Sequence, residues 1–160
     1  MRRSRSWGIG VGLLVALSCL SLPWGHAPQA EEDSLGCSLE TLQGTYIYAY
    51  GGFEIEDGKR SPLAFAGQEV YYGDGTMSGV YTANVNGTIV QHIPYAGTYT
   101  LNEDCTGTLT STEEIGNFHY DHFVDPSGDG FSWVATDSGV VASGFERRVS
   151  ELTPPPRQTQ

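Results

Sequence analysis

The stretch GNFHYDHFVD, residues 116–125, places His119, Asp121 and His122 within four consecutive positions of a chain that contains four histidines in all. Imidazole and carboxylate groups this close in sequence are suited to binding a metal ion or to transferring a proton. The aromatic and β-branched residues predict a strand, in which successive side chains alternate between faces, so the two histidines point opposite ways. A two-histidine metal site built from this strand alone is excluded unless a bulge restores it, and we predict no metal site.

His122 lies on the more apolar face of this strand, which we expect to point inward and to leave His119 and Asp121 outside. That face consists of Phe118, Tyr120, His122 and Val124. A buried imidazole acts either as a hydrogen-bonded core residue or as a general acid/base, and the first interpretation is favoured. Burial alone would lower the pKa of His122, whereas a nearby carboxylate such as Glu69 would raise it.

Glu69 is the second candidate for chemistry. In QEVYYGDG it shares a strand face with Tyr71, Leu63 and Phe65, so a carboxylate can point into an apolar interior. Such a group is a usual acid/base device, although more often it is solvated near a rim. The candidate catalytic residues are therefore His122 and Glu69. The aromatic residues expected to contact a ligand are Tyr71, Tyr99, Phe118, Tyr120 and Trp133.

A tyrosine cluster lies in TYIYAYGGFEIE, residues 45–56. One strand face carries Tyr46, Tyr48 and Tyr50, and the other is purely apolar, with Ile47, Ala49, Phe53 and Ile55. Inward tyrosines would offer phenol donors to a ligand, and outward ones would be ordinary cross-strand pairs. The ordinary, outward arrangement is favoured.

Several function classes are excluded by what the sequence lacks. It contains no G-x-S-x-G, H-E-x-x-H, P-loop or dinucleotide-binding motif, which argues against the common hydrolases, zinc proteases and nucleotide-binding enzymes. We predict no cofactor. The formal net charge is −11, which disfavours nucleic acid and anionic lipid as partners.

The elements that would position these residues are short strands separated by turn sequences. Strands are predicted at 45–55, 62–72, 76–84, 87–92, 95–101, 106–112, 117–124, 130–136 and 140–148. Short joints make neighbours antiparallel, and closure at about eight strands removes exposed edges. The fold class is all-β, an antiparallel up-and-down barrel of about eight strands, with a two-sheet sandwich as the alternative. A short helical turn over 38–43 precedes it.

Residues 1–30 are predicted to be a secretory signal peptide, because arginines precede an uncharged, mainly apolar run from Gly8 to Leu22. The protein is then exported, to the periplasm or beyond, with a lipid anchor on Cys19 as the less favoured alternative. Residues 31–150 form one barrel domain, without a membrane span, and the proline-rich tail 151–160 is disordered. In an exported chain the remaining cysteines, Cys37 and Cys105, are expected to form a disulfide.

Two family resemblances concern the barrel. SLETLQGTY looks like the opening of a lipocalin, in which a helical turn precedes G-x-W, with Gly44-Thr45-Tyr46 replacing the tryptophan motif. Arg147 or Arg148 would then stack on Tyr46. AGTYTLNEDCTGTLT, residues 96–110, more closely resembles exported bacterial proteins related to the allene oxide cyclase barrel. That superfamily includes cyclases that shape an apolar substrate in the lumen, but no catalytic residue of theirs aligns with this chain.

Three functions remain open. The favoured one is an exported, acidic barrel that binds a small apolar molecule in its lumen. The second is a cyclase or isomerase that uses His122, Glu69 and a tyrosine. The third is a structural or partner-binding domain with a packed core. The volume of the lumen distinguishes the third from the others.

Overall fold

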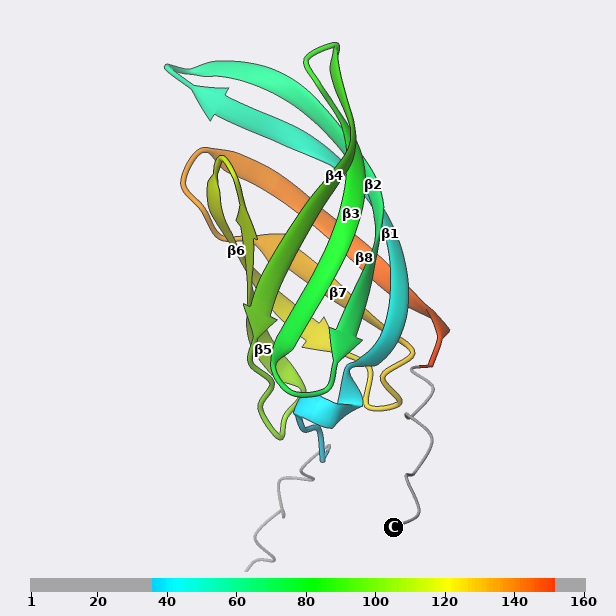
Figure 1. Ribbon diagram of the computed structural model, residues 1–160. Coiled ribbons are helices and arrows are strands. Elements are labelled where there is room, and N and C mark those ends of the chain that lie inside the picture. The colour runs from blue at the N-terminus through cyan, green and yellow to red at the C-terminus, as the bar shows by residue number, and fades with distance from the viewer. Residues whose placement is uncertain (1–35, 152–160) are drawn as a thin grey trace, which may run out of the picture. The chain divides into compact units, whose positions relative to one another are not determined.

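The structure, a computed structural model, describes residues 36–151. In this part of the chain eight antiparallel strands close into a barrel in sequence order (Figure 1). A single 3-10 turn precedes them. The elements are η1 (Leu39–Thr41), β1 (Gln43–Glu56), β2 (Lys59–Tyr72), β3 (Thr76–Val85), β4 (Thr88–Tyr99), β5 (Thr106–Glu113), β6 (Gly116–Val124), β7 (Gly130–Ala135) and β8 (Val140–Ser150). The predicted barrel and its N-terminal helical turn are confirmed, and the sandwich alternative is not. The predicted signal peptide, Cys19 and nearly all of the predicted tail lie outside the described residues.

The two strands predicted at 87–92 and 95–101 are one strand, β4. Pro94 lies inside it, opposite Val80 of β3, and a register shift between Tyr81 and Ala83 marks a bulge beside it. The residues of β4 that pair with β5 are only Ala96–Tyr99, so the first half of β4 has no described partner on that side. A proline is tolerated there because its missing N–H would have no ladder partner. The strand therefore bends but does not end at Pro94.

The two ends of the barrel differ. In Figure 1, η1 crosses the lower end, while the β1–β2 and β3–β4 hairpins rise beyond the upper end. We call these the closed end and the open end. No helix among residues 36–151 is long and apolar enough to cross a bilayer.

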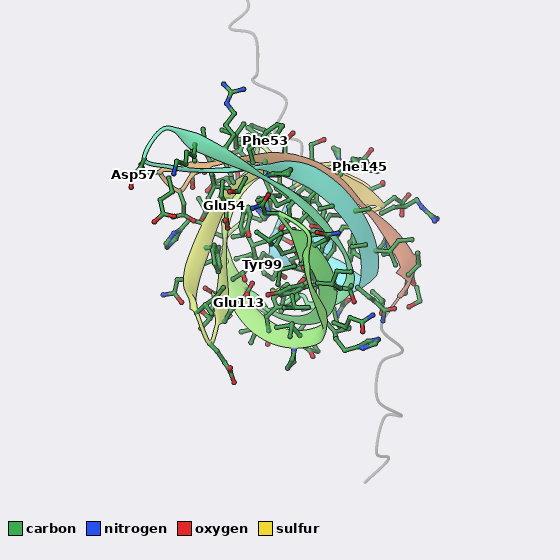
Figure 2. All side chains as sticks on the ribbon, turned by 90° about the horizontal axis from the view of Figure 1, so that it is seen from above. Phe53, Glu54, Asp57, Tyr99, Glu113 and Phe145 are labelled. Carbon is green, nitrogen blue, oxygen red and sulfur yellow. A yellow bond between two sulfur atoms is a disulfide. The ribbon has the colours of Figure 1, made fainter. Side chains whose placement is uncertain are left out.

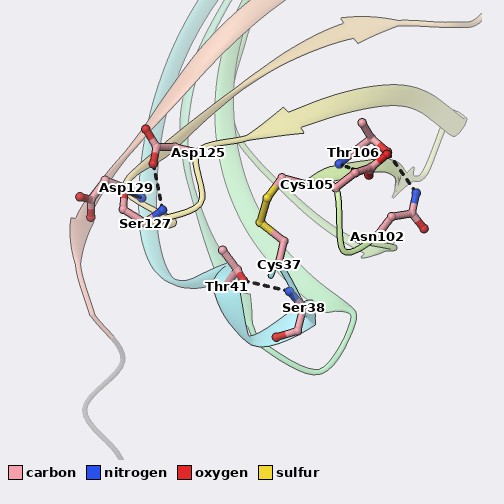
Figure 3. Close-up of a disulfide and its surroundings, with 10 residues drawn as sticks. Cys37, Ser38, Thr41, Asn102, Cys105, Thr106, Asp125, Ser127 and Asp129 are labelled. Carbon is pink, nitrogen blue, oxygen red and sulfur yellow. Dashed lines mark hydrogen bonds between the residues drawn. A yellow bond between two sulfur atoms is a disulfide. The ribbon is translucent and has the colours of Figure 1, made fainter. Parts of the chain in front are cut away.

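The closed end is held by a disulfide and by repeated turn geometry. The predicted bond between Cys37 and Cys105 is present, with the Cα atoms 5.1 Å apart (Figure 3). It ties the segment before η1 to the β4–β5 turn. In the turns at this end, three aspartates accept the backbone N–H two residues further along: Asp74 from Thr76, Asp104 from Thr106 and Asp125 from Ser127. Short-range side-chain hydrogen bonds of this kind stabilise turns without long-range partners.

Above these turns, the lower half of the barrel is a packed core. Its largest fully buried side chains are Tyr46, Tyr71, Phe131, Leu42, Met77 and His122. Tyr46 donates its hydroxyl proton to the Gly128 carbonyl, and Tyr99 donates to carbonyl oxygens of the helical turn region. The hydroxyl group of a core tyrosine therefore binds η1 directly, which explains why so short a helical turn keeps a fixed place.

The prediction that Tyr46, Tyr48 and Tyr50 point outward is wrong. Tyr46 is fully buried and the other two are half-buried inside, whereas Ile47 and Phe53 on the opposite face are 39% and 42% exposed. The phenol rings supply apolar area to the interior, and two of the three hydroxyls find hydrogen-bond partners there. Figure 2, viewed along the barrel, shows Phe53 at the margin and Tyr99 within the ring of strands.

Glycines make room for the inward rings. Each lies directly opposite an aromatic residue on the neighbouring strand: Gly67 opposite Tyr48, Gly79 opposite Tyr95, and Gly144 opposite Trp133. A Cβ atom on Gly79 would lie 2.5 Å from the Tyr95 ring, and one on Gly144 would lie 2.6 Å from Trp133. We call these glycine–aromatic pairs. They set how far each ring reaches across the lumen.

A candidate ligand pocket in the barrel interior

Between the packed core and the open end lies a small inner pocket. It leaves about 30 Å³ to water-sized spheres, where one water needs roughly 10–15 Å³. Its walls come from all eight strands, and every lining residue but one is Tyr, Trp, Glu or Ser. The lining residues are Tyr48, Tyr50, Glu69, Tyr81, Tyr95, Leu109, Ser111, Glu113, Tyr120, Trp133 and Glu146. The lumen is therefore almost filled, and its filling is aromatic and acidic.

A hydrogen-bonded chain of two tyrosines ends on Glu69. Tyr95 donates to Glu69 Oε2 over 2.5 Å, and the hydroxyls of Tyr48 and Tyr95 are 3.0 Å apart. Because the Tyr95 proton is used on the carboxylate, Tyr48 must be the donor between the two phenols. Burial raises the pKa of Tyr48 and of Tyr95 well above the ordinary value, and the charge of Glu69 adds to this effect on Tyr95, so both tyrosines stay protonated donors. The chain orients Glu69 within the pocket.

Glu146 faces Glu69 across β1. The two side chains are 3% and 2% exposed, and neither Glu69 Oε1 nor Glu146 Oε2 has a hydrogen-bond partner among the described residues. Burial, and after it the neighbouring charge of Glu69, raises the pKa of Glu146 well above its ordinary value. Two ionised carboxylates at this depth would be strongly destabilising. Glu146 therefore keeps its proton, and we call the two residues the carboxyl pair.

Glu113 occupies the side of the pocket nearest the surface. It accepts hydrogen bonds from the Tyr81 hydroxyl, at 2.6 Å, and from the Ser111 hydroxyl, at 3.3 Å. Its side chain points into the ring of strands in the view along the barrel (Figure 2). The hydrogen bond between Tyr81 and Glu113 closes this side of the inner pocket.

On the other side of that hydrogen bond lies a larger surface pocket, the outer pocket, of about 300 Å³ by the same measure. It opens where β4 has no partner strand. Its lining is mostly apolar apart from glutamates: Tyr81, Val90, Ile93, Pro94, Glu113, Glu114 and Ile115. Tyr81 and Glu113 line both pockets. Movement of these two side chains would connect the apolar outer pocket with the acidic inner one.

The structure gathers only some of the predicted site residues in the pocket. Glu69, Tyr120 and Trp133 line it. Tyr71 and Tyr99 are buried in the packed core. Phe118 is half-buried and does not line the inner pocket. Their proposed roles as ligand contacts stay predictions.

His122 points inward as predicted, but it lies in the packed core and does not line the inner pocket. Its Nε2 is 2.9 Å from the Thr100 carbonyl oxygen, so Nε2 carries the proton and the ring is the hydrogen-bonded core histidine that the sequence favoured. Burial lowers the pKa of His122, outweighing the smaller opposite effects of Thr100 and Glu69. His119 is outside, with Nδ1 2.8 Å from Asp137. A catalytic role for His122 is untested.

The sequence interpretation missed Glu146, Glu113 and most of the tyrosines. Glu146 alternates with Phe145, whose ring looks like the inward group but is 58% exposed. The sequence could have predicted Tyr95 as an inward residue, because it is four positions from Tyr99 and therefore shares a strand face with it. Among the described residues no group of three or more His, Cys, Asp or Glu side chains is arranged to hold a metal ion.

Comparison with known proteins adds little to this geometry. No family model matches the chain, and no curated protein matches it. Similar solved structures include a de novo designed fluorescence-activating β-barrel, with 14% identity, 71% of this chain and 99% of that chain covered, and a TM-score of 0.49. A redesigned β-barrel bound to DFHBI has 21% identity, with 69% of this chain and 98% of that chain covered, and a TM-score of 0.46. The S-type phycobiliprotein lyase CPES from Guillardia theta has 10% identity, with 79% of this chain and 100% of that chain covered, and a TM-score of 0.41.

At these TM-scores and identities the likenesses carry no inference about function. The barrel predicted from the sequence is established by the strand pairing, which forms a closed barrel from β1 through β8. Membership of the lipocalin or allene oxide cyclase families stays a prediction. Arg148 does lie opposite Tyr46 in the ladder, which is where the lipocalin resemblance expects an arginine, and it hydrogen-bonds to Asp129 at 2.7 Å.

Proposed function

We propose that this protein binds a small molecule whose polar head enters the inner pocket and whose apolar body occupies the outer pocket. The observation that carries the proposal is the sharing of Tyr81 and Glu113 by the two pockets. An apolar mouth that narrows to a few convergent polar groups is the usual form of a ligand site. The outer volume of about 300 Å³ is at the lower end of the range for such sites.

The inner pocket refines the expectation of an apolar ligand. A hydrocarbon in this volume of about 30 Å³ would offer no hydrogen bond to the carboxyl groups of Glu69 and Glu146, and a buried polar group left unsatisfied costs about 1–3 kcal/mol. A head group that donates hydrogen bonds would satisfy them. The proposed ligand is therefore amphipathic, with a head no larger than one or two heavy atoms unless side chains move.

A second candidate function is catalysis of a cyclisation or isomerisation. It is favoured by one observation: a buried carboxyl group of raised pKa, Glu146, lies in the same pocket as Glu69, whose Oε2 accepts a hydrogen bond from Tyr95. In such a reaction Glu146 would donate a proton and Glu69 would accept one. His122, the first candidate from the sequence, does not line that pocket.

We also propose that the protein works outside the cytoplasm, in the periplasm or the medium. The disulfide between Cys37 and Cys105 supports an oxidising compartment, together with the predicted signal peptide.

The test of ligand binding is native mass spectrometry of the full chain purified from its own host, looking for a bound small molecule. Ser111→Leu would fill the inner pocket, and Thr112→Leu, on the outward face of the same strand, is the matched control. The bound mass should be lost from the first variant and kept by the second. A mass retained by Ser111→Leu would place the ligand elsewhere. Release of a chemically altered product from an added ligand would favour catalysis.

A further inference from the structure

We infer that the head group bound by the inner pocket is a cation, a primary ammonium group held between Glu69 and Glu146. This inference rests on the proposed function, because it specifies the chemical class of ligand for the same pocket. It is carried by two buried carboxyl groups that share one pocket, by the absence of basic side chains from the lining, and by the aromatic walls.

The carboxyl pair defines what the ligand must offer. Glu69 Oε1 and Glu146 Oε2 belong to buried carboxyl groups of one pocket, and in the ligand-free protein the donor between these two groups is the proton that Glu146 retains. Once Glu146 loses that proton, both carboxylates accept and do not donate, and an ammonium group supplies three donors and no acceptor. A carboxylate or phosphate head group would be repelled, and an alcohol would satisfy one oxygen at most.

The charges around the pocket have one sign. Three of its lining residues are glutamates, and none is Lys, Arg or His. The described basic residues lie elsewhere, with Lys59 and Arg60 on the β1–β2 hairpin and Arg147 and Arg148 on β8. A buried acidic group normally has a partner cation, and here no described residue supplies one. The net charge of −11 would further concentrate cationic ligands near the protein.

The aromatic walls of the inner pocket also favour a cation. Tyr50, Tyr120 and Trp133 line the pocket, and the rings of Tyr50 and Tyr120 meet the Trp133 ring edge-on at centroid distances of 4.6 and 5.1 Å. Aromatic faces within about 6 Å attract an ammonium group, most strongly where it is desolvated. The volume of about 30 Å³ admits a primary ammonium and not a trimethylammonium group.

Binding a cation should release a proton. The side chains that face the carboxyl pair come from five strands and include no group that is cationic at neutral pH: Tyr46, Tyr48, Tyr71, Tyr95, Glu113, Tyr120 and His122. Burial keeps His122 neutral. One proton therefore stabilises the pair in the ligand-free protein. When an ammonium group takes its place, Glu146 ionises and that proton passes to the solvent, so charge is conserved in the pocket.

The test uses four probes with the same four-carbon chain: butylammonium, butanol, butyrate and butyltrimethylammonium. Binding to the full-length protein is followed by the Trp133 indole N–H resonance, which reports from the pocket wall even when affinity is weak. Butylammonium should bind at least about tenfold more tightly than butanol, a difference of about 1.4 kcal/mol. Butyrate and the trimethylammonium compound should not bind. Calorimetry in two buffers of different ionisation enthalpy should show release of up to one proton at neutral pH.

Variants separate charge from shape. Glu146→Gln and Glu69→Gln keep the side-chain volume and should each weaken butylammonium binding at least about tenfold without weakening butanol. The exposed Glu103→Gln in the β4–β5 turn, which lines neither pocket, is the control. Equal affinity of the wild type for amine and alcohol would overturn the cation inference while leaving small-molecule binding intact. If no probe shifts the Trp133 resonance, or no proton is released, the cation inference also fails, and the mass of a co-purified ligand still decides the proposed function.

Discussion

Replacing Glu146 with glutamine should stabilise the ligand-free barrel, and the gain should grow with pH. Burial and then the charge of Glu69 raise the pKa of Glu146 well above its ordinary value. In the unfolded chain a glutamate ionises near pH 4.3. Above that pH the folded protein holds one proton more than the unfolded chain, so the free energy of unfolding falls as pH rises. The slope is about 1.4 kcal/mol per pH unit until the folded pKa is passed.

Glutamine does not ionise, so the variant should lose this slope. Urea unfolding of the two proteins, followed by circular dichroism at several values from about pH 5 to about pH 8, gives the difference in unfolding free energy at each pH. That difference should be small near pH 5 and should increase by about 1.4 kcal/mol per pH unit above it. Using the difference also removes the effect of His122.

His122 acts in the opposite direction. Its pKa is lowered by burial, so its contribution to stability is present above about pH 6.5 and is lost as pH falls. Both proteins share this contribution. Glu114→Gln, exposed in the β5–β6 turn, should run parallel to the wild type. If Glu146→Gln runs parallel too, Glu146 ionises normally in the folded protein, and the carboxyl pair does not exist as described.

Other parts of the barrel give three more predictions. Replacing Cys37 and Cys105 with serine should lower the free energy of unfolding by about 4 kcal/mol, since the bond closes a loop with a sequence separation of 68, and thiol titration of the unfolded, unreduced wild type should find no free thiol from these two residues. Gly79→Ala should cost about 1–3 kcal/mol in urea unfolding, because its Cβ would meet the Tyr95 ring, and much less in a Tyr95→Leu background; equal costs in both would refute the pairing. In an NMR titration the His122 ring should titrate below about pH 6.5, and a midpoint at or above that value would mean that burial does not dominate its environment.

The sequence predicted the fold well because turn residues and strand periodicity are local signals. Asn86-Gly87 and the loop around Gly128 mark chain reversals wherever the strands lie, and eight such strands have few ways to avoid exposed edges. Pro94 misled because its effect depends on whether the next strand pairs with it. That is decided by closure of the barrel and not by the residue itself.

The site was predicted less well, because alternation identifies two faces of a strand without saying which one is inside. For β6 the choice was correct, since one face was clearly more apolar. For β1 it was wrong, since tyrosine is both apolar and hydrogen-bonding and the apolar face is the one left on the surface. Glu146 could not be found in this way. A lone glutamate shortly after a glycine and directly before two arginines looks like a surface residue, and only its position across β1 from Glu69 gives it a partner for a proton.

The glycine–aromatic pairs bear on how this barrel could acquire other specificities. Gly144 is opposite Trp133, and Gly79 is opposite Tyr95. Replacing the aromatic residue with a smaller one and the glycine with a larger one are therefore compensating changes within one glycine–aromatic pair. Within each pair, the large and the small residue could exchange strands without altering strand register or the turns. The free volume in the lumen would then move around the barrel in discrete steps, one glycine–aromatic pair at a time. The disulfide-bonded end would stay unchanged. Among homologues, such positions should vary in pairs.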